Sequence, residues 1–499
     1  MNKTVKLILP FAVGVAVFLS YFVLSPQGLG LPAWLFLSIF VGMVVGLILE
    51  PIPPAYMSLI GLVLAVFLKV GPPQSGDAAA TVSSGAAINW GLGGFSNSTV
   101  WLIFAAFSIG LGYQQSGLGR RIALGLVQAL GKKTLGLGYA IALTDGILAP
   151  FIPSNTARSG GVIYPIVSTI PPMFGSKPDE NPRRIGAYLM WVSLAATCVT
   201  SSMFLTGLAP NLLAIETAAK SGVAKIEWVQ WFVAFAPCGL ILFVLTPLLA
   251  YWLYPPEVKG AGAEMERIKE EYAKLGPLQG RELAMIGISV LALVLWIFPD
   301  LGGLTGGLGE VNSTTVALVA ICLMLAFRVF AWSDFLKNTA AWNVLMWFAT
   351  LVTMAEGLKN VGFLEWLSGR MEAYLQGMSP TAALVGLVLA FYLIHYFFAS
   401  TTAHVSALLM LFISIARAIP GVDVYQATVL MMLSLGVMGV LTPYGTGPSP
   451  VYFGSGYVKG PEFWRLGTIF GLVYLAVFLL VEIPWVTMVA KDWILPAVK

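Results

Sequence analysis

The stretch FIPSNTARSGG, residues 151–161, places a proline, three hydrogen-bonding side chains and an arginine inside a long run of apolar residues. The chain has 499 residues, of which 58% are hydrophobic and only 10% are charged, against about 25% in an ordinary soluble domain. This composition is typical of a polytopic membrane protein, in which each spanning helix needs about 20 mainly apolar residues. The polar stretch therefore indicates an interruption within the membrane interior.

Eleven apolar segments have the length of a membrane span. They cover residues 5–24, 32–49, 55–70, 97–115, 185–206, 229–253, 283–298, 313–331, 339–356, 424–441 and 464–489. Two further apolar regions, about 134–170 and 380–416, each carry a polar cluster in the middle and are predicted to be re-entrant hairpins. We expect an all-α polytopic membrane protein with about eleven transmembrane helices and two hairpins. The N-terminal run is long enough to be the first span, which argues against a cleaved signal peptide.

The distribution of basic residues predicts the orientation. With the N-terminus in the cytoplasm and the C-terminus outside, most of the 27 lysines and arginines fall in cytoplasmic segments. Nothing resembles an organelle transit peptide, which favours a bacterial inner membrane, and no basic stripe suggests nucleic acid. The connection 255–282 is predicted to carry a short surface helix that links two halves. Segments 117–133 and 356–377 precede the two hairpins and are predicted to be interfacial amphipathic helices.

The two halves share a pattern about half a chain length apart. PSNTARSGG at 153–161 pairs with ASTTAHVSA at 399–407. FLTGLAPNLL at 204–213 pairs with VLTPYGTGPSP at 440–450, and both interrupt an apolar helix with Gly, Pro and Thr. The two motifs occur in the same order in both halves, and the halves have opposite predicted orientations in the membrane. This pattern indicates an inverted-topology repeat.

The two polar tips predict an anion site. A half-helix that begins inside the membrane presents unpaired N–H groups and the positive end of its dipole, which favour an anion. Two tips related by a pseudo-twofold axis would suit a dicarboxylate. Ordinary capping and hydrogen bonding between helices is the alternative explanation for such clusters. The predicted carboxylate-binding residues are Ser154, Asn155 and Thr156 at the first tip and Ser400, Thr401 and Thr402 at the second.

Arg158 and His404 stand at equivalent positions, four residues after each tip serine. A charged residue in the membrane interior costs about 2.5–3.5 kcal/mol and indicates function. Arg158 and a protonated His404 would compensate the two charges of a dicarboxylate, whereas the empty site would stay charged and return slowly. This hypothesis predicts exchange, and a carboxylate near His404 would favour the protonated ring. The other histidine, His395, is expected to be a packing residue.

At these residues the sequence resembles the divalent anion/sodium symporter (DASS) family. It is most similar to the branch of plastid 2-oxoglutarate/malate translocators and bacterial citrate/succinate or tartrate/succinate antiporters, over nearly the whole chain. In that family, paired Ser-Asn-Thr tips bind substrate carboxylates and, in sodium-coupled members, help to build sodium sites. The first tip matches in full, but Thr401 stands where sodium-coupled relatives have Asn. Arg158 and His404 fall where fixed cations could replace sodium.

The resemblance also implies site walls, a homodimer and an elevator-like transport domain that moves against a scaffold, with the interfacial helices as connecting arms. The implied walls are Thr206, Pro210 and Asn211 in the first half and Thr442, Thr446 and Pro448 in the second. The expected division is scaffold helices at 1–115, transport domain at 117–220, linking and scaffold helices at 229–355, transport domain at 356–461 and a last transmembrane helix at 462–499.

The leading prediction is a sodium-independent exchanger of dicarboxylates such as 2-oxoglutarate, malate and succinate, without metal or cofactor. A sodium-coupled dicarboxylate or sulfate symporter is the main alternative, supported by the intact first tip. An enzyme using Asp145, Glu356 and His404 would be expected to carry a catalytic motif such as HExxH or GxSxG, and none occurs. Asp145 is instead expected to cap or pair within the first hairpin. A channel is a further alternative, which counterflow would exclude.

Overall fold

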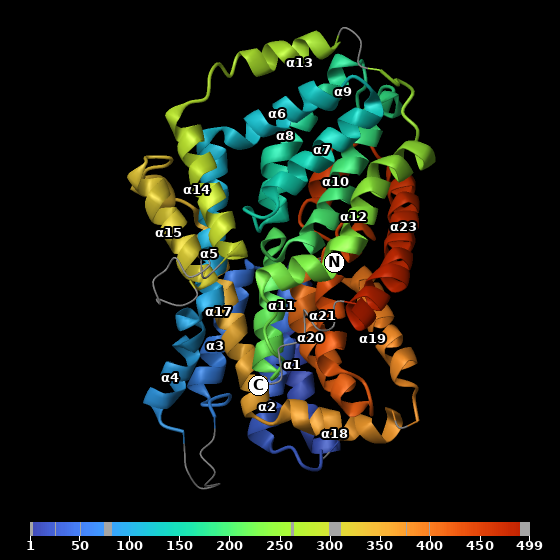
Figure 1. The fold of residues 1–499 in the computed structure, drawn as a ribbon. Coiled ribbons are helices and arrows are strands. Elements are labelled where there is room, and N and C mark those ends of the chain that lie inside the picture. Colours follow the sequence, from blue (N-terminus) through green and yellow to red (C-terminus); the bar gives the residue numbers. More distant parts are fainter. Residues whose placement is uncertain are drawn as a thin grey trace. The chain divides into compact units, whose positions relative to one another are not determined.

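The computed structural model describes residues 3–24, 26–49, 51–73, 82–260, 264–298, 311–375, 377–398 and 400–489. Within these ranges the regular elements are helices, joined by loops with one isolated bridge between Lys133 and Gly260 (Figure 1). The predicted all-α class is therefore confirmed. Ala399 of the second tip motif, and Lys491 and Lys499 of the orientation prediction, lie outside the described residues.

The chain forms two compact units, each built from three separate segments. Unit 1 comprises Met1–Phe104, Leu212–Ile226 and Ala340–Met432, and unit 2 comprises Ala105–Asn211, Glu227–Thr339 and Leu433–Lys499. The first predicted hairpin belongs to unit 2 and the second to unit 1. Each unit also contains helices that were predicted as scaffold, so the division into scaffold and transport domains stays a prediction.

Unit 1 is built around α2, which packs against α1, α3 and α20. Pro54 is the first residue of α3, where its missing N–H costs no hydrogen bond, and the Ser83 hydroxyl caps α4 by accepting from the Ala86 amide at 3.1 Å. The helices are α1 (Lys3–Leu24), α2 (Leu31–Leu49), α3 (Pro54–Phe67), α4 (Ser84–Leu92), η1 (Gly93–Ser96), α17 (Thr339–Asn360), α18 (Phe363–Leu375), α19 (Pro380–Ile394), η6 (His395–Phe397), α20 (Thr401–Ala418) and most of α21 (Val424–Leu433).

Unit 2 is centred on α10 (Gly186–Met203), whose 18 residues are all buried. Its small and hydroxyl-bearing side chains allow close packing against α7 and α12. The other helices are most of α5 (Ser98–Ser116), α6 (Leu118–Leu130), α7 (Thr134–Leu148), η2 (Thr156–Ile163), α8 (Tyr164–Val167), α9 (Ile170–Met173), η3 (Pro182–Arg184), η4 (Leu205–Gly207), α12 (Trp228–Leu253), α13 (Glu264–Ala273), α14 (Gly280–Ile297), α15 (Ser313–Ala326), α16 (Trp332–Leu336), η7 (Val437–Val440), α22 (Ser449–Gly454), α23 (Gly460–Val477), η8 (Phe478–Glu482) and η9 (Trp485–Val489). Helix α11 (Ala209–Lys220) begins in unit 2 and continues into unit 1.

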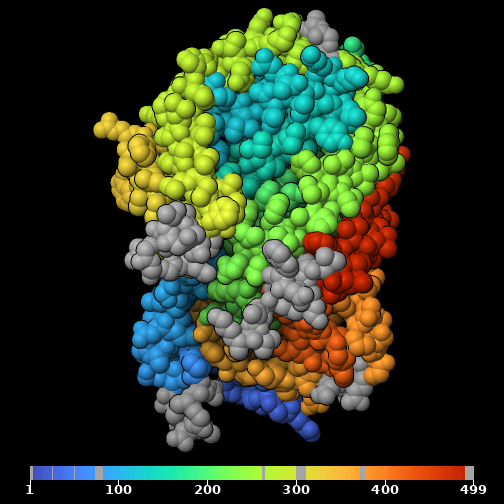
Figure 2. All heavy atoms as spheres, viewed as in Figure 1, coloured from blue at the N-terminus to red at the C-terminus, as the bar shows by residue number. Residues whose placement is uncertain are grey.

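The segments predicted as interfacial and linking helices contain helices, and their position at the membrane interface stays a prediction. Helix α6 corresponds to the predicted 117–133, and it packs against α13, the predicted surface helix of the 255–282 connection (Figure 2). The predicted 356–377 segment is divided, because its first residues end α17 and the separate helix α18 begins only at Phe363. A helix that the sequence did not predict, α4, joins α5 through η1 with a bend of 43°.

Seven helices of the described residues are long and apolar enough to cross a membrane, or eight if the bent α4–α5 pair is one span. The predicted number of eleven is therefore not confirmed. Predicted spans at 55–70, 313–331 and 424–441 form shorter helices. Two of these end where a residue other than glycine takes a left-handed conformation, with φ of 55° at Lys69 and 54° at Arg328.

Each predicted hairpin consists of two helical arms that contact each other on either side of an interruption. In the first, α7 ends at Leu148 and the chain resumes as the π-helix η2 at Thr156. In the second, η6 ends at Phe397 and α20 begins at Thr401. The arms of the second hairpin, Pro380–Phe397 and Thr401–Ala418, are each 18 residues long and could also span. The re-entrant course of the hairpins thus stays a prediction.

Candidate functional site

The first tip is ordered by its own serine. The Ser154 hydroxyl accepts a hydrogen bond from the Ala157 amide at 3.1 Å, and the Ser154 carbonyl accepts from the Arg158 amide at 2.8 Å. This arrangement caps the start of η2 and aligns its first N–H groups. Asn155 is buried, Ser154 is half-buried and Thr156 is exposed.

The interrupted segment 440–450 of unit 2 packs against this tip. Asn155 donates from its amide nitrogen to the Thr446 hydroxyl at 2.7 Å. The next residue, Gly447, comes so close to Thr156 that a β-carbon built on it would lie 1.7 Å from the Thr156 hydroxyl oxygen. Only glycine fits there without displacing the tip. Two predicted groups, the first tip and the wall around Thr446, are thus brought together.

Arg158 is fully buried and its guanidinium is surrounded by acceptors of unit 2. Its Nε donates to the Asp145 carboxylate at 3.1 Å, and one terminal nitrogen donates to the carbonyl oxygens of Ile152 and Gly207, both at 2.7 Å. The other terminal nitrogen lies 3.2–3.4 Å from the hydroxyls of Thr197, Thr200 and Ser201. The side chain therefore joins the hairpin tip to the break that follows α10.

Asp145 gives Arg158 a counter-ion within the same hairpin, as the sequence led us to expect of this carboxylate. Its Oδ2 also accepts a hydrogen bond from the Thr200 hydroxyl, whereas its Oδ1 has no hydrogen-bond partner among the described residues. Because the pair is neutral as a whole, Arg158 is a less direct source of positive charge than the sequence suggested. Compensation of a bound anion by Arg158 stays a prediction.

The second tip, in unit 1, repeats the local geometry of the first. The Ser400 hydroxyl accepts from the Ala403 amide at 3.5 Å, and the Ser400 carbonyl accepts from the His404 amide at 3.1 Å. Thr401 is buried, and Ser400 and Thr402 are half-buried. The two tips therefore correspond in local structure as well as in sequence. The helices that begin at the two tips differ, because α20 is a regular α-helix and η2 is a π-helix.

His404 is fully buried among aromatic rings of unit 1. Its ring centroid lies 4.3 Å from that of Phe391 and 5.1 Å from those of Phe398 and His395. Neither ring nitrogen has a hydrogen-bond partner among the described residues. The carboxylate that would favour a protonated ring is not among these neighbours, so this part of the charge hypothesis stays a prediction. His395 is buried and packs against His404, as expected of a packing residue.

The predicted wall residues of the first broken helix make bonds that close the break. The Thr206 hydroxyl donates to the Pro150 carbonyl at 2.6 Å. The Asn211 amide donates to the Ser201 carbonyl at 2.8 Å and lies 3.2 and 3.4 Å from two further carbonyl oxygens. The Asn211 contacts cross the interruption that follows α10, and the Thr206 contact joins it to the first hairpin. Pro210 is buried beside them.

The second broken helix keeps unused polar groups in its buried wall. The hydroxyls of Thr442 and Ser449 are buried and have no hydrogen-bond partner among the described residues. Pro448 is buried and precedes the first turn of α22. A loop with orphan hydroxyls beside the Thr446–Asn155 contact has polar groups to offer a ligand. No group of three or more His, Cys, Asp or Glu side chains in the described ranges could hold a metal ion.

Two contacts of unit 2, made by Ser202 and by Arg121, were not predicted from the sequence. The Ser202 hydroxyl accepts from the amides of Gly436 and Val437, at 2.9 and 3.1 Å, and so ties α10 to the start of η7. Arg121 of α6 binds both oxygens of Glu282, at 2.6 and 3.0 Å, which raises the pKa of its guanidinium. The sequence SLAATCVTSSM, residues 193–203, is rich in hydroxyl side chains. This richness could have predicted the Ser202 contact and the hydroxyl acceptors around Arg158.

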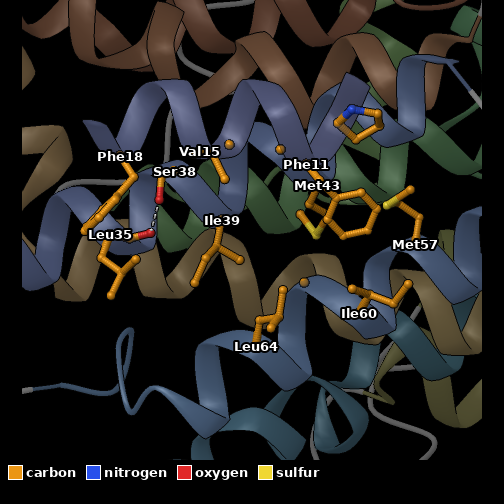
Figure 3. A pocket seen from close by; sticks show the side chains of 14 residues that line it. Phe11, Val15, Phe18, Leu35, Ser38, Ile39, Met43, Met57, Ile60 and Leu64 are labelled. Carbon is orange, nitrogen blue, oxygen red and sulfur yellow. Dashed lines mark hydrogen bonds between the residues drawn. The ribbon is translucent and has the colours of Figure 1, made fainter. Parts of the chain in front are cut away.

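An apolar groove between α1, α2 and α3 of unit 1 has a volume of about 240 Å³ (Figure 3). Carbon and sulfur atoms of residues such as Phe11, Ile39, Met43 and Leu64 line it. The Ser38 hydroxyl in its wall already donates to the Leu35 carbonyl at 2.6 Å. The groove offers no donor for a carboxylate and is not a candidate for an anion site.

Comparisons with known proteins identify a family and relatives over nearly the whole chain. A family model described as "Sodium:sulfate symporter transmembrane region" matches residues 1–491. The chain is 45% identical over 488 residues to the citrate/succinate antiporter of Escherichia coli strain K12, covering 97% of this chain and 98% of that protein. It is 43% identical over 469 residues to the L-tartrate/succinate antiporter of E. coli strain UTI89 / UPEC, covering 93% of this chain and 94% of that protein.

Two solved structures have a similar fold. The YdaH transporter of Alcanivorax borkumensis aligns with a TM-score of 0.55 and 15% identity, covering 92% of this chain and 98% of that one. MtrF of Neisseria gonorrhoeae aligns with a TM-score of 0.57 and 13% identity, covering 93% of this chain and 96% of that one. At these identities the likeness concerns the fold alone.

Proposed function

Because the chain belongs to the sodium:sulfate symporter family, we propose that it is a secondary transporter that exchanges dicarboxylate anions across a membrane. The observation that carries this proposal is the 45% identity to a citrate/succinate antiporter over 97% of the chain. The tartrate/succinate relative shares one named substrate with it, so succinate is the first anion to test. Malate and 2-oxoglutarate are further proposed substrates. The family and these relatives are transporters, and we propose no catalytic activity.

The geometry of the first tip supports an anion at this place. Ser154 holds the start of η2 so that its free N–H groups and its positive dipole end lie at the tip. Thr156 is an exposed residue there, and Asn155 is held against Thr446. We propose that this tip and its equivalent, Ser400, Thr401 and Thr402, each bind a carboxylate group.

The wall residues have two kinds of proposed role. Thr446, Pro448 and Thr442 would line the substrate space. The hydroxyls of Thr442 and of the adjacent Ser449 have no hydrogen-bond partner among the described residues and could bind a substrate. Thr206, Pro210 and Asn211 would act by holding the first break in shape, because their polar groups contact backbone carbonyls. We also propose an elevator-like movement, a homodimer and a bacterial inner membrane location with a cytoplasmic N-terminus.

Uptake of labelled succinate into proteoliposomes tests the proposed exchange. Vesicles are either empty or preloaded with unlabelled succinate, in a sodium-free medium. We expect uptake into loaded vesicles only. Equal uptake into empty and loaded vesicles would refute exchange. Citrate, L-tartrate, malate and 2-oxoglutarate, each loaded inside in turn, then rank the counter-substrates.

A sodium-coupled symporter is the second candidate. The family description and the complete Ser-Asn-Thr sequence of the first tip favour it, and Thr401 at the second tip disfavours it. An inward sodium gradient across empty vesicles distinguishes the two. Concentrative uptake of succinate or sulfate under that gradient would support the symporter and leave the fold and the site unchanged.

A further inference from the structure

The last span of unit 2 contains a buried carboxyl group for which the described residues provide no hydrogen-bond partner. Glu482 is fully buried, and neither of its carboxyl oxygens has a hydrogen-bond partner among the described residues. The other buried acidic side chains of the described ranges, Asp145, Glu216 and Glu282, each have a basic partner within 3.1 Å. An ionised carboxylate in such surroundings is too costly to persist, so this carboxyl group must be neutral where it lies.

Glu482 lies where two helices are both interrupted. The last span changes from α-helix to π-helix at Phe478–Glu482 and again at Trp485–Val489, on either side of Pro484, which has no N–H for the helix ladder. Opposite it, Pro237 interrupts the ladder of α12 and leaves the Val233 carbonyl without its usual donor. The Trp485 indole donates to that carbonyl at 3.0 Å.

The contact between η8 and α12 is otherwise apolar. Phe478 and Phe235 face each other with ring centroids 6.5 Å apart. Cys238 is buried in α12, the helix against which η8 packs, three residues after Phe235. The α23 segment contributes Tyr474, whose hydroxyl is engaged with Thr246 and with the Ala195 carbonyl, and η9 contributes no titratable group. No basic side chain therefore faces Glu482 from these elements.

We propose that Glu482 is a proton-binding site, and that the π-helical end of the last span docks on the Pro237 kink of α12 only while this carboxyl carries its proton. Loss of the proton to water leaves a charge that needs hydration. The two interrupted helices offer the place for water to enter, because their ladders are already broken there. Deprotonation thus separates η8 from α12 and exposes Cys238.

The labelling rate of Cys238 tests this proposal on the full-length protein. Replacing Cys198 and Cys322 by serine leaves Cys238 as the single thiol, and a second background keeps only the exposed Cys322 to report how the reagent itself responds to pH. We expect the Cys238 rate, divided by the Cys322 rate, to rise severalfold from mildly acidic to alkaline pH. With Glu482→Gln, which imitates the neutral carboxyl, the ratio should stay low throughout. Equal ratios in both proteins at every pH would overturn the proposal.

A measurement on the wild-type side chain covers the case in which Glu482→Gln does not fold. Infrared spectra of protein carrying ¹³C-labelled glutamate identify the C=O stretch of protonated glutamate by its isotope shift. The buried Glu216 and Glu282 are ion-paired and give no such band. We expect a glutamate C=O band at neutral pH that disappears as Cys238 becomes reactive. Its absence at neutral pH would contradict the proposal. Neither experiment depends on the substrate, so the proposal about Glu482 can fail while the exchange proposal holds, and the reverse.

Discussion

Removing the Arg158 side chain should destabilise the protein unless the buried charge of Asp145 is removed as well. Arg158→Met deletes the ion pair and two bonds of 2.7 Å to the carbonyls of Ile152 and Gly207. It leaves Asp145 buried with the Thr200 hydroxyl as its remaining described partner. Removing one member of a buried pair costs about 3–5 kcal/mol, because the other charge is left uncompensated. The ratio of folded to unfolded protein should fall by about 10²–10³·⁵.

The double variant Arg158→Met/Asp145→Asn separates the buried charge from the other losses. It removes the carboxylate charge and keeps an acceptor for Thr200. The remaining cost is that of the two carbonyls, about 1–3 kcal/mol for each, which Arg158→Met carries as well. Apparent melting temperatures in detergent measure the difference, at about 1 °C per kcal/mol for a chain of 499 residues. The double variant should melt above Arg158→Met. If the two variants melt together, at or below the wild-type temperature, Asp145 is not the partner that the structure shows.

The same pair of variants tests what Arg158 does in transport. If Arg158 positions the tip, recovery of stability in the double variant should bring back part of the succinate exchange. If its charge compensates the substrate, exchange should stay absent in the double variant although the protein is folded. Measured side by side, melting temperature and exchange rate decide between the two roles.

Three further substitutions probe the packing around the site. Gly447→Ala should cost about 1–3 kcal/mol by overpacking the tip and should lower succinate exchange, whereas Gly454→Ala, with open space around it, should melt like wild type; equal melting temperatures would refute the close fit. Ser202→Ala should cost about 1–3 kcal/mol because two buried amides lose their acceptor, and an unchanged melting temperature would show that they find another. Arg121→Lys should lose the paired contact with Glu282 and about 1.5–3 kcal/mol, and thermal stability equal to wild type would contradict it.

The tips were predictable because a polar cluster inside an apolar run has few physical explanations. Backbone groups in a membrane must be satisfied, so serine at positions 154 and 400 predicted a capped half-helix, and the structure has such a cap at both. Sequence alone could not show that η2 is a π-helix. Its course depends on contacts from distant residues, among them the bond between Arg158 and the Gly207 carbonyl.

Helix lengths and side-chain partners were harder to predict, for separate reasons. Hydropathy follows composition and does not register the left-handed backbone at Lys69 and Arg328, where two apolar runs stop being helical. Arg158 and His404 occupy equivalent positions, but one meets a carboxylate and the other meets aromatic rings. A sequence repeat predicts where a side chain lies on its helix. It does not predict the partners of that side chain, because these come from other segments of each unit.

Release of labelled succinate from preloaded proteoliposomes tests the central claim most directly. The vesicles are diluted into medium that contains either no dicarboxylate or unlabelled succinate, each with and without sodium. If the protein is an exchanger without sodium, label should leave only when external dicarboxylate is present. Release into dicarboxylate-free medium at the same rate, or release that requires sodium, would contradict the account.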